Sequence, residues 1–275
     1  GRTGRLRVHV GDIREAKTVA RCMEGVDGVF HLATQGSSTH VRTPRLTVEV
    51  LLDGTFNVLE AALTQTVKKV VFASSASMYG AAEEFPTPER HHPYNDRTLY
   101  GTCKLAGEGM LRSFYEMYGL NYVALRYFDV YGPRMNLSRM STEMIMRWLN
   151  AIDRQEPPVV FDDDQQRLDL VYVEDVAEVN VRAMSSHVTD VTCNVGSGRE
   201  VSLSELVSLL VELTGSSVQP VYQPPRRDDA ATRCLADTRL AERVLGFRAR
   251  TELQEGLRRL IAWRYQTVLS PMHLT

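Results

Sequence analysis

The amino-acid sequence predicts an α/β fold in which helices cover a mainly parallel β-sheet. Short runs rich in Val and Phe alternate with stretches whose apolar residues recur at helical spacing, which is typical of strands joined by crossover helices. The composition agrees with this fold class. A chain of 275 residues with 43% hydrophobic and 24% charged residues can bury a full core without disulfides or metals.

The regular alternation occupies the first half of the chain. Strands are expected at four apolar runs: Leu6–Gly11, Gly28–Ala33, Lys69–Ser74 and Tyr122–Phe128. Helices of about three to six turns are expected between them, at Glu15–Glu24, Arg45–Leu63 and Leu99–Tyr118. Small or polar residues follow each strand, and ligands of open α/β sheets bind in the crevice beyond these carboxyl ends. The functional site is therefore expected there.

The pattern becomes less regular after Gly132-Pro133 and predicts a smaller lobe over the edge of the sheet. Short strands are expected at Val159–Phe161 and Leu168–Val173. Helices are expected at Thr142–Ile152, Asp175–Ser185, Leu203–Leu213 and Leu253–Tyr265. Ser202 and Glu205 have the spacing of a capping box, which marks the start of the third of these helices.

Charge and cysteine usage exclude several classes of function. The 32 Lys and Arg residues are balanced by 34 Asp and Glu, so no basic field would attract a nucleic acid. No apolar stretch reaches the roughly 18 to 20 residues of a membrane span, and the N-terminus does not resemble a signal peptide. A cytoplasmic protein without a membrane contact is therefore expected. The four cysteines form no CxxC pair or zinc pattern, so no metal site is expected.

Tyr100 and Lys104 form a Tyr-x-x-x-Lys pair inside a predicted helix. A spacing of four places both side chains on one helical face, where the ammonium can lower the pKa of the phenol from about 10 and make it a usable general base. The spacing alone favours a surface pair, because many helices carry Tyr and Lys four residues apart on an exposed face. The segment Ala73–Gly80 favours a site, because its serines follow a buried strand and place hydroxyls in the expected crevice.

Motifs in a fixed order over nearly the whole length give the chain a specific resemblance. They are Gly11–Arg14, His31–Ala33, Gly54–Ala61, the Ser75 cluster, Tyr100–Lys104, Leu125–Arg134, Asp169–Ala177, Asn194–Gly198, Ala236–Asp237 and Leu245–Phe247. The chain resembles the extended short-chain dehydrogenases/reductases of the NAD-dependent nucleotide-sugar epimerase/dehydratase family, and most closely the UDP-glucose 4-epimerase group. The resemblance implies a Rossmann-like, doubly wound NAD-binding domain at 1–128, joined by about 166–190, and a mostly substrate-binding lobe at 129–275.

The resemblance also implies roles for individual residues. In catalysis Tyr100 would transfer the proton, Lys104 would bind the nicotinamide ribose, and Ser75 would hydrogen-bond the sugar oxygen. NAD would be lined by Tyr100, Lys104 and a further set: Asp12, Ile13, Leu32, Ala33, Thr34, Ser74 and Phe128. The nucleotide sugar would contact Ser75, Ser77, Asp129, Arg227 and Cys234. Arg227 would grip the diphosphate, and Cys234 would either border the C2 substituent of the sugar or pack as a small buried hydrophobe.

Two departures from the family pattern concern the cofactor and the sugar. The Gly-rich turn that holds a pyrophosphate is absent, as is the acidic residue expected about 20 positions later. The first strand-helix-strand unit is therefore expected to be missing from this chain and to be encoded upstream of Gly1. Asp129 stands where the family more often has Asn, which leaves the identity of the sugar open.

Three functions follow from the resemblance. The leading one is NAD-dependent C4 epimerisation of a UDP-linked hexose through a 4-keto intermediate. A 4,6-dehydratase is less favoured, because its acid and base would stand where this chain has Ala76 and Ser77. A non-catalytic, truncated relic with weak nucleotide-sugar binding is the third. A homodimer is expected through the helices Arg45–Leu63 and Leu99–Tyr118, unless their apolar faces only cover the sheet.

Overall fold

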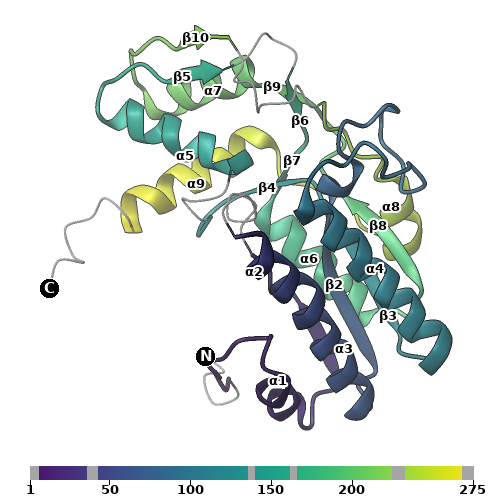
Figure 1. Cartoon of the computed structure of the whole chain (residues 1–275). Coiled ribbons are helices and arrows are strands. Elements are labelled where there is room, and N and C mark those ends of the chain that lie inside the picture. Colours follow the sequence, from purple (N-terminus) through teal and green to yellow (C-terminus); the bar gives the residue numbers. More distant parts are fainter. Residues whose placement is uncertain (1–5, 36–42, 136–139, 162–165, 225–232, 268–275) are drawn as a thin grey trace, which may run out of the picture.

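A four-stranded parallel sheet forms the centre of the molecule, in the order β1-β2-β3-β8. The computed structural model describes residues 6–35, 43–135, 140–161, 166–224 and 233–267. The strands of the sheet are β1 (Gly28–His31), β2 (Lys69–Ser75), β3 (Tyr122–Tyr127) and β8 (Val191–Val195). Helices lie on both sides of the sheet (Figure 1), which confirms the predicted doubly wound arrangement.

Each face of the sheet has its own set of helices. One face is covered by α1 (Ala16–Met23), α3 (Gly54–Thr64) and α4 (Leu99–Tyr118), and the other by α6 (Val173–Ser185) and α8 (Arg239–Leu245). Successive residues of a strand point to opposite faces. Accordingly Val70 and Phe72 pack with the first set, whereas Val71 between them packs with the second. Burial on both faces explains why the strand is a continuous apolar run.

α4 has the bounds that the sequence predicts. Thr98 caps its start, because its hydroxyl accepts a hydrogen bond from the Gly101 N–H at 3.0 Å. Gly119 ends it with a φ of 72°, a left-handed conformation that glycine adopts without strain. Gly107 lets the helix approach the sheet closely, since a Cβ there would lie 2.7 Å from the ring of Phe72. The glycine therefore allows α4 to pack directly against β2.

The helix expected at Arg45–Leu63 has three parts. α2 (Pro44–Val48) leads into η1 (Glu49–Asp53), a π-helical segment, which continues as α3. The residues next to η1 on either side have right-handed helical backbone, so the chain keeps its direction through this segment. Insertion of a π-helical turn is consistent with a local change of register along a helix.

A second lobe lies beyond the carboxyl ends of the sheet strands (Figure 1). Its helices are α5 (Met140–Asp153), α7 (Leu203–Thr214) and α9 (Leu253–Thr267), and its strands are β5 (Val159–Phe161) and β10 (Val221–Gln223). Ser202 and Glu205 form the predicted capping box at the start of α7. Leu203, Leu206, Val207 and Leu210 repeat at helical spacing and bury one face of α7 in an aliphatic core.

The strand expected at Leu6–Gly11 is wrong. Residues 6–11 form no strand, and Leu6, Val8 and Val10 are 82%, 77% and 97% exposed. Alternating apolar residues form a strand only where a neighbouring strand pairs with their backbone groups, and among the described residues none pairs here.

The strand expected at Leu168–Val173 is also wrong in part, because Asp169 divides it. β6 (Arg167–Leu168) pairs with β9 (Val201–Ser202), and β7 (Leu170–Tyr172) pairs with β4 (Asp129–Tyr131). β8 was not expected at all. Its sequence, Val-Thr-Cys-Asn-Val, alternates apolar and polar residues over only five positions, a short strand pattern that sequence analysis missed. None of the helices in the described ranges is long and apolar enough to cross a lipid bilayer.

Candidate active site

Tyr100 and Lys104 lie on the face of α4 that packs against the end of β2. Lys104 is 2% exposed, and its Nζ donates a hydrogen bond to the carbonyl oxygen of Ala73 at 2.7 Å. The same nitrogen lies 5.7 Å from the centre of the Tyr100 ring and 5.1 Å from that of Phe72. Burial excludes the surface-pair interpretation of this spacing. The helix instead places a buried positive charge beside a half-buried phenol.

Ser75 begins a polar turn at the carboxyl end of β2. It caps η2 (Ala76–Tyr79), a short 3₁₀-helix, and its Oγ accepts a hydrogen bond from the Ser77 N–H at 3.1 Å. The Ser75 hydroxyl also donates to the Ser77 Oγ at 3.0 Å. Ser75 is half-buried and Ser77 exposed, so both hydroxyls can reach a ligand. α4 packs against η2. The structure therefore brings the serine turn to the helix that carries Tyr100.

The end of β1 lies beside the end of β2. His31 pairs with Phe72 in the sheet, and its Nε2 lies 3.0 Å from the Thr55 hydroxyl. Burial, with a smaller contribution from the nearby Lys104 charge, lowers the pKa of His31 to about 3, so this ring stays neutral. Leu32 and Ala33 follow it and are exposed, and Thr34 is half-buried. Their backbone is thus accessible at the carboxyl edge, as the sequence predicts for a cofactor-lining segment.

Asp12 and Ile13 lie farther from this centre, next to α3. The carboxylate of Asp12 accepts hydrogen bonds from the Arg14 side chain and its N–H, and these bonds lower the pKa of Asp12. The carbonyl oxygen of Ile13 accepts a hydrogen bond from Asn57 Nδ2 at 2.9 Å. A hollow of about 360 Å³ is lined here by Asp12, Arg14, Glu15, Glu49 and Asp53. Its walls carry both signs of charge.

Asp169 joins three segments on the substrate side of the site. Its carboxylate is buried and accepts hydrogen bonds from the N–H groups of Ser197, Gly198 and Ala236 at 2.6, 3.0 and 3.0 Å, and from the Ser197 hydroxyl. Its carbonyl oxygen accepts a further bond from the Asp129 N–H at 3.1 Å. Burial raises the pKa of Asp169, and the four bonds to its carboxylate oppose this rise. The lobe and the sheet are tied together at this residue.

Three further predicted site residues lie around this junction, one predicted for the cofactor and two for the sugar. Phe128 is 7% exposed and packs with Met78 and Tyr79, and Cys234 lies partly buried against the same cluster. Burial raises the pKa of the Cys234 thiol, with Asp129 nearby as a smaller cause. The structure therefore brings Phe128, Asp129 and Cys234 together. Arg227 lies outside the described residues.

A buried polar network beneath the serine turn was missed by sequence analysis. It links Ser74, Glu108, Arg126, Tyr79 and Asn194. Two signals could have found it. Glu108 lies one helical turn after Lys104 on the same face of α4, and Arg126 interrupts the otherwise apolar run of β3. Ser74, predicted to line the cofactor, uses its hydroxyl inside this network, which leaves its backbone for other contacts.

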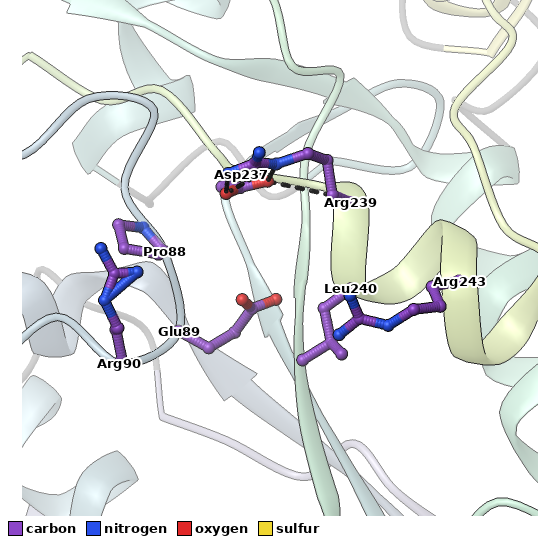
Figure 2. Close-up of a pocket in the computed structure, with 7 residues that line it drawn as sticks. All are labelled: Pro88, Glu89, Arg90, Asp237, Arg239, Leu240 and Arg243. Atoms are coloured by element: carbon purple, nitrogen blue, oxygen red, sulfur yellow. Dashed lines mark hydrogen bonds and ion pairs between the residues drawn. The ribbon is translucent and has the colours of Figure 1, made fainter.

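A second hollow borders this network at Glu89. Its volume is about 460 Å³, and it is lined by Pro88, Glu89, Arg90, Asp237, Arg239, Leu240 and Arg243 (Figure 2). None of these residues belongs to the predicted site. Glu89 extends from its loop toward β8 and accepts a hydrogen bond from the Asn194 N–H at 2.9 Å. Among the described residues, no group of three His, Cys, Asp or Glu side chains could hold a metal ion.

Comparisons with known proteins agree with this geometry. UDP-glucose 4-epimerase of Mycolicibacterium smegmatis is 32% identical over 85% of this chain and 74% of its own length. A UDP-glucose 4-epimerase of Thermotoga maritima, solved with UDP-glucose, has a TM-score of 0.88 and 32% identity over 94% of this chain and 84% of its own. MoeE5, solved with UDP-glucose and NAD and also with UDP-glucuronic acid and NAD, is 33% identical, with TM-scores of 0.86 and 0.87 over 97% of this chain and 88% of its own.

The family model of NAD-dependent epimerases and dehydratases matches residues 1–196, which include both the Ser75 turn and the Tyr100–Lys104 pair. The cofactor of this family is NAD. With this match, and with relatives of 32% identity over most of the chain, the chain belongs to the NAD-dependent epimerase/dehydratase family.

Proposed function

We propose that the protein inverts the C4 centre of a UDP-linked hexose through a 4-keto intermediate. The observation that carries this proposal is the juxtaposition of Tyr100, the buried Lys104 and the Ser75 turn at the carboxyl ends of β1 and β2. An acid–base tyrosine beside an accessible hydroxyl suits removal of a proton from an alcohol. The related epimerases support the choice of a nucleotide sugar as substrate.

The described residues fit one end of NAD. The accessible backbone of Leu32 and Ala33 adjoins the buried ammonium of Lys104 and the end of β2, so the edge offers an apolar strand end beside a fixed cation. Phe128 would border the nicotinamide, and Asp12 with Ile13 would lie toward the adenine. Bound NAD supplies a hydride acceptor, and in its reduced form a hydride donor, at the carbon of the sugar.

The protein's own residues move and hold the proton. Tyr100 takes the proton from the 4-hydroxyl as that carbon loses a hydride, which leaves a flat ketone. The Ser75 hydroxyl turns away from Ser77 Oγ, donates its hydrogen bond to the same sugar oxygen and keeps that oxygen oriented. When the ketone is reduced on its opposite face, Tyr100 returns the proton to the oxygen. No atom is gained or lost overall, so inversion needs only one acid–base group with a fixed charge beside it.

The 4,6-dehydratase alternative requires an additional acid and base for loss of water. The two positions after Ser75 are Ala76 and Ser77, neither of which titrates near neutral pH. A carboxylate in this part of the site is Asp129, across the junction with the lobe. The structure therefore favours inversion over elimination. We assign the cofactor to the sheet and most of the sugar contacts to the lobe.

We also propose that two copies associate through α3 and α4. Phe56 on α3 and Met117 and Tyr118 on α4 are 44%, 66% and 52% exposed, although all three are large and apolar. Burying such side chains is favourable by roughly 25 cal/mol per Å² of apolar surface. Sedimentation equilibrium of the purified protein would show a dimer, and a monomer at micromolar concentration would contradict the proposed association.

We also propose that the protein is cytoplasmic.

Replacement of Tyr100 by Phe tests the assigned chemistry. The change removes the hydroxyl but keeps the ring against Lys104, so we expect turnover to fall by about 10² to 10⁴. Binding of the UDP-sugar, measured by calorimetry, should change little. Tyr115→Phe, on the same helix, is the control and should retain turnover. Near-normal activity of Tyr100→Phe would refute the assignment, and absence of activity toward any UDP-hexose in the unaltered protein would refute the proposed function.

Replacement of Cys234 by Tyr tests the sugar. If the small thiol leaves room for a C2 N-acetyl group, the protein will accept UDP-glucose and UDP-N-acetylglucosamine, and the bulky substitution will suppress the acetylated sugar by about tenfold or more. Both sugars should be assayed beside UDP-glucuronic acid, because Asp129 would repel a carboxylate. Equal loss of the first two activities would support the packing interpretation of Cys234 instead.

A further inference from the structure

A row of polar side chains crosses the sheet beneath the serine turn. Ser74, Arg126 and Asn194 occupy paired positions on β2, β3 and β8. Paired residues of neighbouring strands point to the same face, and here that face is the one covered by α4. Glu108 reaches this row from α4. All four residues are buried, Glu108 and Asn194 completely.

The four residues and Tyr79 form one hydrogen-bonded network. Arg126 donates from Nε and Nη2 to the two carboxylate oxygens of Glu108 at 2.9 and 2.7 Å. Glu108 also accepts from the Ser74 hydroxyl at 2.5 Å. Arg126 Nη1 donates to the Tyr79 hydroxyl at 2.7 Å, which donates in turn to Asn194 Oδ1 at 2.7 Å. Burial raises the pKa of Tyr79 to about 12, so its hydroxyl keeps the proton that it donates.

Stability alone is a poor explanation for this ion pair. Removing a carboxylate and a guanidinium from water is costly, and apolar residues of similar volume are often at least as stabilising. A buried network in which every group is satisfied instead fixes a single geometry. Each buried side-chain nitrogen and oxygen of the network has a partner within the described residues. The network therefore fixes the geometry of the segments that it joins.

The network holds both ends of the turn that contains Ser75. Ser74 immediately precedes Ser75, and Tyr79 closes η2 four residues after it. Glu108 also belongs to the same helix as Lys104 and Tyr100. Lys104 bonds to the carbonyl oxygen of Ala73, and Glu108, one turn later, bonds to the hydroxyl of Ser74. Two consecutive residues of β2 are thus anchored by two consecutive turns of α4.

We propose that Glu108, through its pair with Arg126, is a positioning residue that fixes Ser75 relative to Tyr100 and Lys104. Its consequence for the reaction rests on the proposed function, whereas its consequence for the geometry does not. A misplacement of about 1 Å in a reacting group can cost about 10²-fold in rate. Loss of the pair should therefore act on the chemical step more than on substrate binding.

Glu108→Gln is the first test, in the protein assayed with NAD and UDP-glucose. It keeps the shape of the side chain but leaves Arg126 without its carboxylate. We expect kcat to fall about tenfold to a hundredfold, with KM within about threefold of its original value. Asp153→Asn is the matched control, because Asp153 pairs with the buried Arg264 in the lobe, far along the chain from the site. This variant should lower the melting temperature comparably and keep kcat within about twofold.

Two milder variants keep the test decisive if Glu108→Gln does not fold. Ser74→Ala and Tyr79→Phe each remove one hydroxyl and leave the ion pair in place. Each should lower kcat by a larger factor than it changes KM. The double variant Ser74→Ala/Tyr79→Phe should lose less than the sum of the two separate effects on log kcat, because the groups act as one unit. A fall in kcat that merely follows the folded fraction, or that Asp153→Asn matches, would overturn the proposal.

Hydrogen exchange separates this inference from the proposed function. In Glu108→Gln the amides of residues 74–80 should exchange about tenfold faster or more, whereas in Asp153→Asn the acceleration should be confined to the lobe. If the unaltered protein turns over no UDP-sugar, the proposed function fails and the exchange data alone decide the positioning role. Unchanged protection of residues 74–80 in Glu108→Gln would overturn it.

Discussion

The lobe and the carboxyl edge of the sheet both contain buried side chains, but the chemical character of these side chains differs. The lobe core is almost entirely apolar, with Ile145, Leu149, Leu206, Leu210 and Leu260 at its centre. The carboxyl edge instead buries hydroxyl, amide and charged side chains: Ser74, Lys104, Glu108, Arg126, Asp169 and Asn194. Apolar packing is non-directional, whereas hydrogen bonds fix distances and angles. The difference indicates which region supplies stability and which supplies geometry.

The buried ion pair of each region sharpens this contrast. In the lobe Arg264 pairs with Asp153 and bonds to Asn150, but its Nε is the only buried side-chain nitrogen or oxygen without a partner among the described residues. At the sheet edge, both carboxylate oxygens of Glu108 and all three nitrogens of the Arg126 guanidinium are bonded. An incomplete pair tolerates rearrangement, whereas a complete one resists it.

The largest effect is expected from Asp169→Asn, which tests whether the edge depends on directional bonds. Each carboxylate oxygen of Asp169 accepts two hydrogen bonds. In asparagine an NH₂ group replaces one of these oxygens, so the two donors that face it lose their acceptor. At about 1 to 3 kcal/mol for each buried unsatisfied donor, the free energy of unfolding should fall by about 2 to 6 kcal/mol. Urea unfolding measures this. Activity should fall as well, because the Asp169 carboxylate holds the backbone of Ala236, two residues after Cys234.

Asp190→Asn is the matched control for that change. Asp190 is an exposed carboxylate at the opposite end of the sheet, and its Oδ1 accepts a hydrogen bond from the Tyr122 hydroxyl at 2.8 Å. Asparagine can accept the same bond, so the loss should stay below about 1 kcal/mol. An equal loss in the two variants would mean that the four bonds of Asp169 confer no special stability.

Leu206→Ala makes the corresponding test in the lobe. Leu206 is completely buried, and truncation there should lower the free energy of unfolding by about 2 to 5 kcal/mol. At a temperature where the variant remains folded, kcat and KM should be nearly unchanged, because its contacts are apolar and lie in the lobe core. Steady-state kinetics and thermal unfolding check the two halves of this expectation. A large fall in kcat would show that the lobe core also positions the site.

The smallest effect concerns His31 and pH. Its pKa is about 3 in the folded protein and 6.5 in the unfolded chain, so between these values only the unfolded state takes up the proton. Keeping His31 neutral therefore contributes to the free energy of unfolding above pH 6.5, and this contribution is lost as the pH falls toward the pKa of the folded protein. Between pH 6.5 and 5 the loss should be about 1 to 2 kcal/mol, and His31→Asn should abolish it. The same measurement on His187→Asn, an exposed site, should show the original pH dependence.

Local sequence patterns determined much of this protein. Alternation of apolar runs with helical stretches predicted β1, β2, β3 and the full length of α4, because helix period and strand apolarity are properties of neighbouring residues. The four-residue spacing of Tyr100 and Lys104 predicted one helical face for the same reason. The Ser202–Glu205 capping box was equally local. The order of motifs along the chain then predicted the family.

Only the tertiary structure decided the features that depend on pairing. Leu6–Gly11 and β8 both alternate apolar and polar residues, but only β8 is a strand, because a strand exists only where a neighbour pairs with its backbone. The Glu108–Arg126 network likewise depends on the register of β2, β3 and β8 and on the close approach of α4 at Gly107. Its members are up to 120 positions apart, from Ser74 to Asn194, and only register brings side chains so distant in sequence to the same level of a sheet.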